Sequence, residues 1–238
     1  MNQNIADNEV KNRIFGIALL DLRQMKSIDE LCNISEIVNV GAILLSDAFK
    51  GTIASIPMSS VGGVITVPEG CKLNKIEGTL KISGNFMENL NGDGTEILLV
   101  SGDLIITSPF TRFGYESLIV TGDLFVPRGC EQILAPFIKQ NTGQIIYIDH
   151  ENVRMFTGQD RFSKDFFTYI KKPMTMILMG EFLIESDVSV ELLQEKVSQI
   201  VLMGVLKAEE KKLVPLLLAL TEEKYGEIVV SNTLEGES

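Results

Sequence analysis

The sequence predicts an α/β fold, a right-handed repeat solenoid with one long parallel β-sheet. The main observation is a short phrase, a glycine followed by alternating apolar residues, that returns along most of the 238-residue chain. Seven of the nine steps between successive phrases are 20 to 25 residues long. Self-similarity at such a period is typical of a solenoid, in which each repeat packs on its neighbours. The phrases begin at Gly16, Gly41, Gly63, Gly78, Gly102, Gly122, Gly143, Gly180, Gly204 and Gly226.

Two longer internal matches indicate that the repeats share one template. Residues 63–71 and 122–130 have glycine, proline, glycine and cysteine in common at a constant offset of 59. Residues 27–41 parallel residues 189–204 with one extra residue. Since no linker rich in proline, glycine or serine interrupts the repeats, we expect a single domain over residues 1–238. Residues 1–12 and 231–238 are polar and are expected to be caps or tails.

Each phrase is expected to be a strand, because its apolar residues alternate and it is rich in Val, Ile and Leu. The glycine that opens it suits a tight bend or a close backbone approach. The long step between Gly143 and Gly180 is expected to hold an insertion at residues 157–172. Between residues 53 and 110 the returns are short and rich in Gly, Asn, Ser and Pro, which favours loops.

Other returns have the spacing of short helices, at residues 28–34, 131–140, 190–199 and 209–223. Ser27 and Ser189 precede two of them and are candidate N-caps. Pro136 and Pro215 are expected to interrupt the other two. The solenoid therefore has loop returns in its middle and helical returns toward its ends.

Over residues 14–230 this pattern resembles a leucine-rich-repeat-like solenoid, with a middle section closer to a parallel β-helix. The asparagine that leucine-rich repeats place after the strand is absent from most units. The resemblance therefore implies an architecture, and no functional residue is carried over from it.

Composition excludes several classes of function. The net charge is −11, which disfavours nucleic acids and anionic membranes, since both attract clustered Lys and Arg. No apolar run approaches the 18 or so residues of a membrane span, and the first residues lack the apolar segment of a secretory signal. We expect a cytoplasmic protein.

The sequence contains no clear motif for catalysis, metal binding or phosphate binding. Cys32, Cys71 and Cys130 form neither a disulfide framework nor a zinc motif. His150 lies between two carboxylates, but adjacent residues of a strand point to opposite faces. The glycines open strands rather than helices, so no phosphate-binding fingerprint is present. We expect no catalytic residue, no metal and no cofactor.

The strand faces supply the candidate site. Residues two and four positions after each glycine are apolar and are expected to face the interior, yet the residue three positions after it is also mostly apolar. Stacked repeats would align these residues into an apolar stripe on the outer face, beside an acidic row directly after the glycines. Either a segment of the chain, such as residues 162–170, or a partner covers such a stripe. The candidate binding residues are Leu44, Ile105, Phe125, Ile146 and Leu183, with Asp103, Asp123 and Glu181 from the acidic row.

A second candidate surface is a loop rim that follows the phrase at Gly102. Phe110, Phe113 and Tyr115 cluster there. Loops along one edge of a solenoid often bind partners, although aromatic residues at such a corner can equally cap the core.

The expected function is a non-enzymatic cytoplasmic interaction or scaffold protein that self-associates or binds another protein. The alternative is a structural β-solenoid that polymerises through its exposed strand edges. A third hypothesis is a polysaccharide-active enzyme that uses the acidic row, since carboxylates gathered on a sheet face perform such chemistry.

Overall fold

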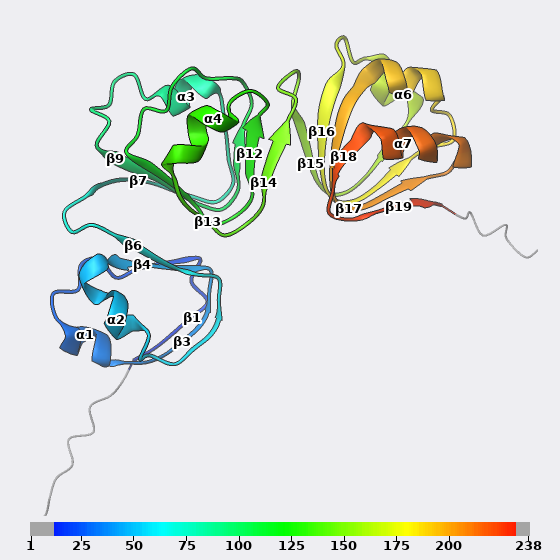
Figure 1. The fold of residues 1–238 in the computed structure, drawn as a ribbon. Coiled ribbons are helices and arrows are strands. Elements are labelled where there is room, and N and C mark those ends of the chain that lie inside the picture. The colour runs from blue at the N-terminus through cyan, green and yellow to red at the C-terminus, as the bar shows by residue number, and fades with distance from the viewer. Residues whose placement is uncertain (1–11, 232–238) are drawn as a thin grey trace, which may run out of the picture. The chain divides into compact units, whose positions relative to one another are not determined.

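The computed structural model describes residues 12–231, which form short parallel strands in several sheets together with short helices (Figure 1). The chain divides into two compact units. Unit 1 holds the described residues up to Ile105, with Thr111–Leu124 and Gln132–Ile145. Unit 2 holds Ile106–Phe110, Phe125–Glu131 and the described residues from Ile146 onward. The single domain stays a prediction, and nearly all of the expected caps or tails lie outside the described residues.

The first group of repeats forms two small sheets. One has the order β1-β3-β5 and the other the order β2-β4-β6, and all the neighbouring strands are parallel. The strands are β1 (Asn12–Phe15), β2 (Leu19–Asp21), β3 (Ile34–Val40), β4 (Ala42–Ser46), β5 (Met58–Val61) and β6 (Val64–Val67).

The second group repeats this arrangement with four strands in each sheet. The orders are β13-β11-β9-β7 and β14-β12-β10-β8. The strands are β7 (Lys72–Glu77), β8 (Leu80–Ile82), β9 (Glu96–Ser101), β10 (Leu104–Ile106), β11 (Ser117–Val120), β12 (Leu124–Pro127), β13 (Ile138–Asn141) and β14 (Ile145–Ile148).

The third group forms one sheet in the order β15-β16-β17-β18, and β19 also pairs with β17. Its strands are β15 (Arg154–Phe162), β16 (Met174–Ile184), β17 (Val197–Ala208), β18 (Thr221–Lys224) and β19 (Glu227–Val230). The parallel arrangement is confirmed, but the prediction of one long sheet is wrong, because the described residues form five sheets. Stacking that is consistent with a solenoid-like repeat occurs within each group, and its handedness stays a prediction.

Columns of glycines explain why the phrase recurs. In the third group Gly158, Gly180 and Gly204 are register partners, and Gly226 follows in the same column. A Cβ added at Gly180, Gly204 or Gly226 would lie closer than 3.0 Å to the carbonyl oxygen of the preceding glycine. Real Cβ atoms essentially never approach so closely, so only glycine lets these backbones stack.

Unit 1 has two columns of the same kind. They comprise Ala18, Gly41 and Gly62 in the first group, and Gly78, Gly102, Gly122 and Gly143 in the second group. In these groups the glycine lies between two short strands, whereas in the third group β15, β16 and β17 run through it. The sequence prediction placed a strand after each glycine and missed most of the strands that precede it.

The column also corrects the expected insertion. Gly158 pairs with Gly180 in register, so residues 157–172 contain the end of β15 and the helix α5 (Lys164–Thr168), which together belong to an ordinary repeat. The step from Gly143 to Gly158, which is 15 residues long, marks the change from the second group to the third. The step from Gly62 to Gly78, 16 residues long, marks the change from the first group to the second.

The helices follow the capping signals. Ser27 caps α1 (Ile28–Cys32) by accepting a hydrogen bond from the Glu30 backbone N–H at 3.3 Å. Ser189 caps α6 (Val190–Lys196) in the same way, accepting from the Leu192 N–H at 3.2 Å. Both predicted caps are confirmed, because each serine satisfies a backbone donor that the first helical turn leaves unpaired.

The remaining helices are short. Pro136 and Pro215 lie in the first turns of a 3₁₀ turn and of α7, where proline is tolerated, rather than interrupting longer helices. The single turn α3 occupies a region predicted to be loop, since five residues are too few to show a helical period. These elements are α2 (Lys50–Ile53), α3 (Gly84–Glu88), α4 (Glu131–Leu134) and α7 (Val214–Leu220), with 3₁₀ turns at Asp47–Phe49, Ala135–Phe137 and Lys211–Leu213.

The apolar interior lies between strands and helices within each group. In unit 2, Phe182, Leu202 and Leu206 pack with Leu193 of α6 and Leu217 of α7. The first group has a similar core against α1 and α2. The predicted interior positions are buried at Leu104, Ile106, Leu124, Val126, Phe182 and Ile184, whereas Ile145 and Val230, predicted by the same rule, are both 37% exposed. Among the described residues, no helix has the length and apolar character needed to span a membrane.

We predict that Gly180→Ala destabilises the protein by about 3 kcal/mol or more, because a backbone atom occupies the Cβ position and the φ of Gly180 is +138°. Gly51→Ala is the matched control. Its Cβ would meet nothing within 4 Å, and alanine favours the helix α2 by about 0.5–1 kcal/mol. Urea unfolding measures both changes, and equal stabilities for the two variants would contradict the stacking argument.

Candidate functional site

The structure buries the residues that were expected to form an exposed apolar stripe. Leu44, Ile105, Phe125 and Ile146 have no exposed area, and Leu183 is 9% exposed. The expectation of one accessible stripe through these residues is therefore corrected. The same burial supports the alternative that the chain covers this face itself.

Strands of the second group cover the outer face of the β2-β4-β6 sheet of the first group. Leu44 and Ile65, on the strands after the glycine column, pack in one cluster with Ile97, Leu99 and Ile119 of β9 and β11. All of these residues belong to unit 1. The cover is thus the sheet before the glycine column of the second group, and not the segment 162–170 that the sequence suggested.

The acidic row has a structural role in unit 1. The Asp103 carboxylate accepts hydrogen bonds from the Asp123 backbone N–H at 2.9 Å and from the Thr79 hydroxyl at 3.3 Å. The Asp123 carboxylate accepts one from the Gln144 N–H at 2.8 Å. Each side chain therefore joins its repeat to the next one. Glu181, the third acidic candidate, belongs to unit 2.

We predict that Asp123→Ala lowers the free energy of unfolding by about 1–2 kcal/mol, because the Gln144 N–H loses its acceptor. Asp123→Asn keeps an oxygen at the same position and should cost much less. Thermal or urea unfolding compares the two variants. If alanine and asparagine behaved alike, the carboxylate would not hold the next repeat as described.

The predicted loop rim is a packed corner. Phe110, Phe113 and Tyr115 are 3%, 9% and 4% exposed. The Phe113 ring lies 5.5 Å from Tyr115 and 5.0 Å from Phe137, centroid to centroid. The Tyr115 hydroxyl lies 3.4 Å from the Phe86 carbonyl oxygen, to which it donates. Burial, helped by Glu96, raises the pKa of Tyr115.

Two carboxylates around this corner form hydrogen bonds or ion pairs with neighbouring residues. A hollow of about 420 Å³ in unit 1 is lined by Phe113 and Tyr115 together with Glu88 and Asp93. Glu88 accepts from the backbone N–H and the hydroxyl of Thr111, both at 2.9 Å, and these bonds lower its pKa. The hydrogen bond from the Lys72 ammonium, and to a smaller extent those from Thr95, lower the pKa of Asp93. The arrangement supports the core-capping interpretation of the rim.

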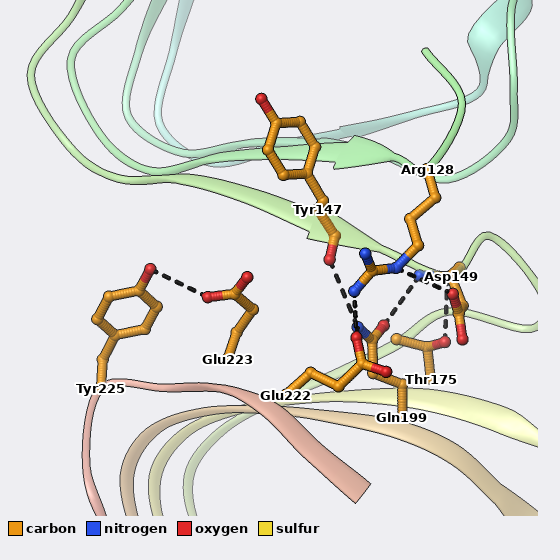
Figure 2. A network of polar contacts seen from close by, with 8 residues as sticks. All are labelled: Arg128, Tyr147, Asp149, Thr175, Gln199, Glu222, Glu223 and Tyr225. Atoms are coloured by element: carbon orange, nitrogen blue, oxygen red, sulfur yellow. Dashed lines mark hydrogen bonds and ion pairs between the residues drawn. The ribbon is translucent and has the colours of Figure 1, made fainter. Parts of the chain in front are cut away.

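Unit 2 contains a polar network between the end of β14 and one face of the third sheet (Figure 2). Gln199 is fully buried, and its side-chain oxygen accepts from the Asp149 N–H at 2.9 Å. Its amide nitrogen lies 3.4 Å from the Tyr147 carbonyl oxygen and 3.5 Å from Glu222. Thr175, also fully buried, donates to the Asp149 carbonyl oxygen at 3.0 Å.

Arg128 forms ion pairs with two members of this network on the side that faces solvent. Its Nε lies 3.3 Å from the Asp149 carboxylate, and its Nη2 contacts Glu222. Its backbone N–H donates to the Ile148 carbonyl oxygen at 2.9 Å. Every polar group of the buried Gln199 side chain therefore has a partner, and the network joins the end of β14 to the third sheet.

We predict that Gln199→Met destabilises the protein by about 1–3 kcal/mol, because the buried Asp149 N–H is left without its acceptor. The control is Gln159→Met, at an exposed position of the same sheet, which should stay within about 0.5 kcal/mol of the wild type. Chemical denaturation measures both, and a neutral Gln199→Met would show that the junction contributes nothing.

An uncovered surface of unit 2 lies on the same sheet, beyond the glycine column. Before the column, the outward residues Ile177 and Val201 are fully buried, whereas Met179 and Met203 next to the glycines are half-buried. After the column, two outward rows run across β15, β16, β17 and β19. We name these residues the open face: Gln159, Glu181, Val205 and Glu227 in one row, and Arg161, Leu183, Lys207 and Val229 in the next.

The open face combines charges of both signs with apolar residues. It borders a hollow of about 460 Å³ that Arg161, Glu181, Leu183 and Lys207 line. The Lys207 ammonium contacts the Glu181 carboxylate, and Arg161 lies 3.8 Å from Glu185. Each of the eight residues of this face is half-buried or exposed except Leu183.

The glycine phrases predict four members of this face, because Glu181 and Glu227 follow their glycines directly and Leu183 and Val229 lie three positions after them. Lys207 also lies at that third position, as an exception to its apolar pattern. Arg161 is not predicted, since Gly158 lies within the expected insertion. Aligning Gly158 with Gly180 would have placed Gln159 and Arg161 in the two rows.

None of the eight open-face residues is a histidine or a cysteine. Within residues 12–231, no three His, Cys, Asp or Glu side chains are grouped so that they could hold a metal ion. No protein family, curated protein or solved structure matches this chain.

Proposed function

We propose that this protein is a non-enzymatic interaction scaffold with a solenoid-like repeat, and that the open face binds another protein. One observation carries this proposal. The outward residues after the glycine column are buried at Leu44, Ile105, Phe125 and Ile146, whereas the equivalent rows of the third sheet are largely uncovered. A repeat surface that the chain covers elsewhere is left available here.

The composition of the open face suits a protein partner. Val205 and Val229, both half-buried, supply apolar area on the sheet, and charged and polar residues lie beside them. Mixed surfaces of this kind are typical of non-obligate protein interfaces. Two cations and two anions lie in the rows, so the surface lacks the basic character that a phosphate backbone requires.

The other hypotheses have less support. Asp103 and Asp123 each accept backbone hydrogen bonds, so the acidic row is engaged in stacking rather than available for glycoside chemistry. One strand edge that growth could use is that of β15, which ends its sheet. That strand has Gly158 at a φ of +89° and the charges of Asp160 and Arg161, which are features that protect edges from pairing.

A photo-reactive residue tests the proposal in the full-length protein in its own cells. We predict that p-benzoylphenylalanine at position 205 gives a discrete protein adduct on irradiation. Tyr169, 83% exposed and outside the open face, is the matched control position. If position 205 gave no adduct beyond that of position 169, the open face would not be a binding surface.

A further inference from the structure

We infer that the partner of the open face is a second copy of this chain, which docks the outer face of its β1-β3-β5 sheet there. This inference rests on the proposed function and names the partner of the same site. The contact would be head-to-tail, since the two faces involved are different surfaces of one chain.

The chain already makes contacts of this type internally. In unit 1, strands after the first glycine column pack outward against β9 and β11, which precede the second column. In unit 2, Thr175 and Gln199, which precede the third column, bond to the end of β14, which follows the second column. In both places the sheet after one column meets the sheet before the next column.

This rule leaves two faces unmatched in the described residues. One is the open face, which follows the last column. The other is the outward side of β1, β3 and β5, which precedes the first column. Its residues include Phe15, which is 70% exposed, and Val38, its register partner. Pairing these two faces between copies would repeat the internal contact.

Charge supports the same pairing. The chain carries a net charge of −11, so two copies repel each other over most of their surface. The β1-β3-β5 face carries Arg13 and Glu36, which form an ion pair at 2.8 Å. The open-face rows carry two positive and two negative residues, with Asp160 beside them adding one negative charge. Both faces are therefore close to neutral and have apolar residues next to an ion pair.

A complementation experiment with purified full-length protein tests the inference. We expect the mass from sedimentation equilibrium to rise with concentration up to about 100 µM, a range that detects micromolar association. Phe15→Glu blocks one face and Val205→Arg blocks the other, and each alone should weaken association by at least about tenfold. Arginine at position 205 would lie between Glu181 and Glu227, so the sheet should tolerate it.

The mixture of the two variants is the decisive sample. Each variant keeps the face that the other has lost, so an equimolar mixture should form a one-to-one dimer and grow no further. Tyr169→Glu, which removes an equally exposed aromatic ring elsewhere, should associate as the wild type does. Unchanged circular dichroism confirms that each variant is folded.

The cross-linker at position 205 provides a second measurement that needs no destabilising change. In purified protein, we expect adducts to residues of β1, β3 or β5 of another copy. A monomeric wild type at about 100 µM, or a mixture that stays monomeric, would overturn the inference. If cells nevertheless gave an adduct with a different protein at position 205, the proposed function would stand and only the self-association would fail.

Discussion

The fold depends on one constraint, the close approach of backbones at the glycine columns. A carbonyl oxygen of one repeat occupies the space where the Cβ of the next repeat would lie. Any other residue would push the repeats apart and break the parallel hydrogen bonds on both sides of the column. The spacing of the glycines along the sequence therefore fixes which residues meet across neighbouring strands.

The columns also determine what each strand face does. Residues on one side of the sheet line the core, and those on the other side are outward. Because the chain forms three columns rather than one, it has places where outward faces meet each other. The clusters around Leu44 and Gln199 are two such contacts, one apolar and one polar. The open face of unit 2 and the β1-β3-β5 face of unit 1 are outward surfaces without such a contact in the described residues.

Much of this arrangement could be predicted from the sequence. The glycine period indicated parallel stacking, the alternation indicated the interior positions, and Ser27 and Ser189 indicated helix starts. These signals are local, because each depends on residues within one repeat or on a constant offset. The carboxylates of Asp103 and Asp123 also follow their glycines at the same position, a regularity that suits a repeated backbone hydrogen bond.

The rest depended on tertiary contacts. Strands before the columns, such as β7 and β13, are too polar to show clear alternation. The phrase at Gly158 is polar as well, so its repeat resembled an insertion. The burial of Leu44 or Phe125 depends on a second layer that no single repeat encodes. Without that layer, covered and uncovered outward residues look alike in the sequence, and the open face could not be separated from the others.

The central claim is that equivalent glycines of successive repeats lie side by side. Nuclear Overhauser measurements on a sample with labelled glycine test it directly, since neighbouring strands lie about 4.8 Å apart. The account predicts contacts between Gly180 and Gly204 and between Gly204 and Gly226. Contacts from these glycines to residues of another register, with none between the glycines themselves, would contradict it.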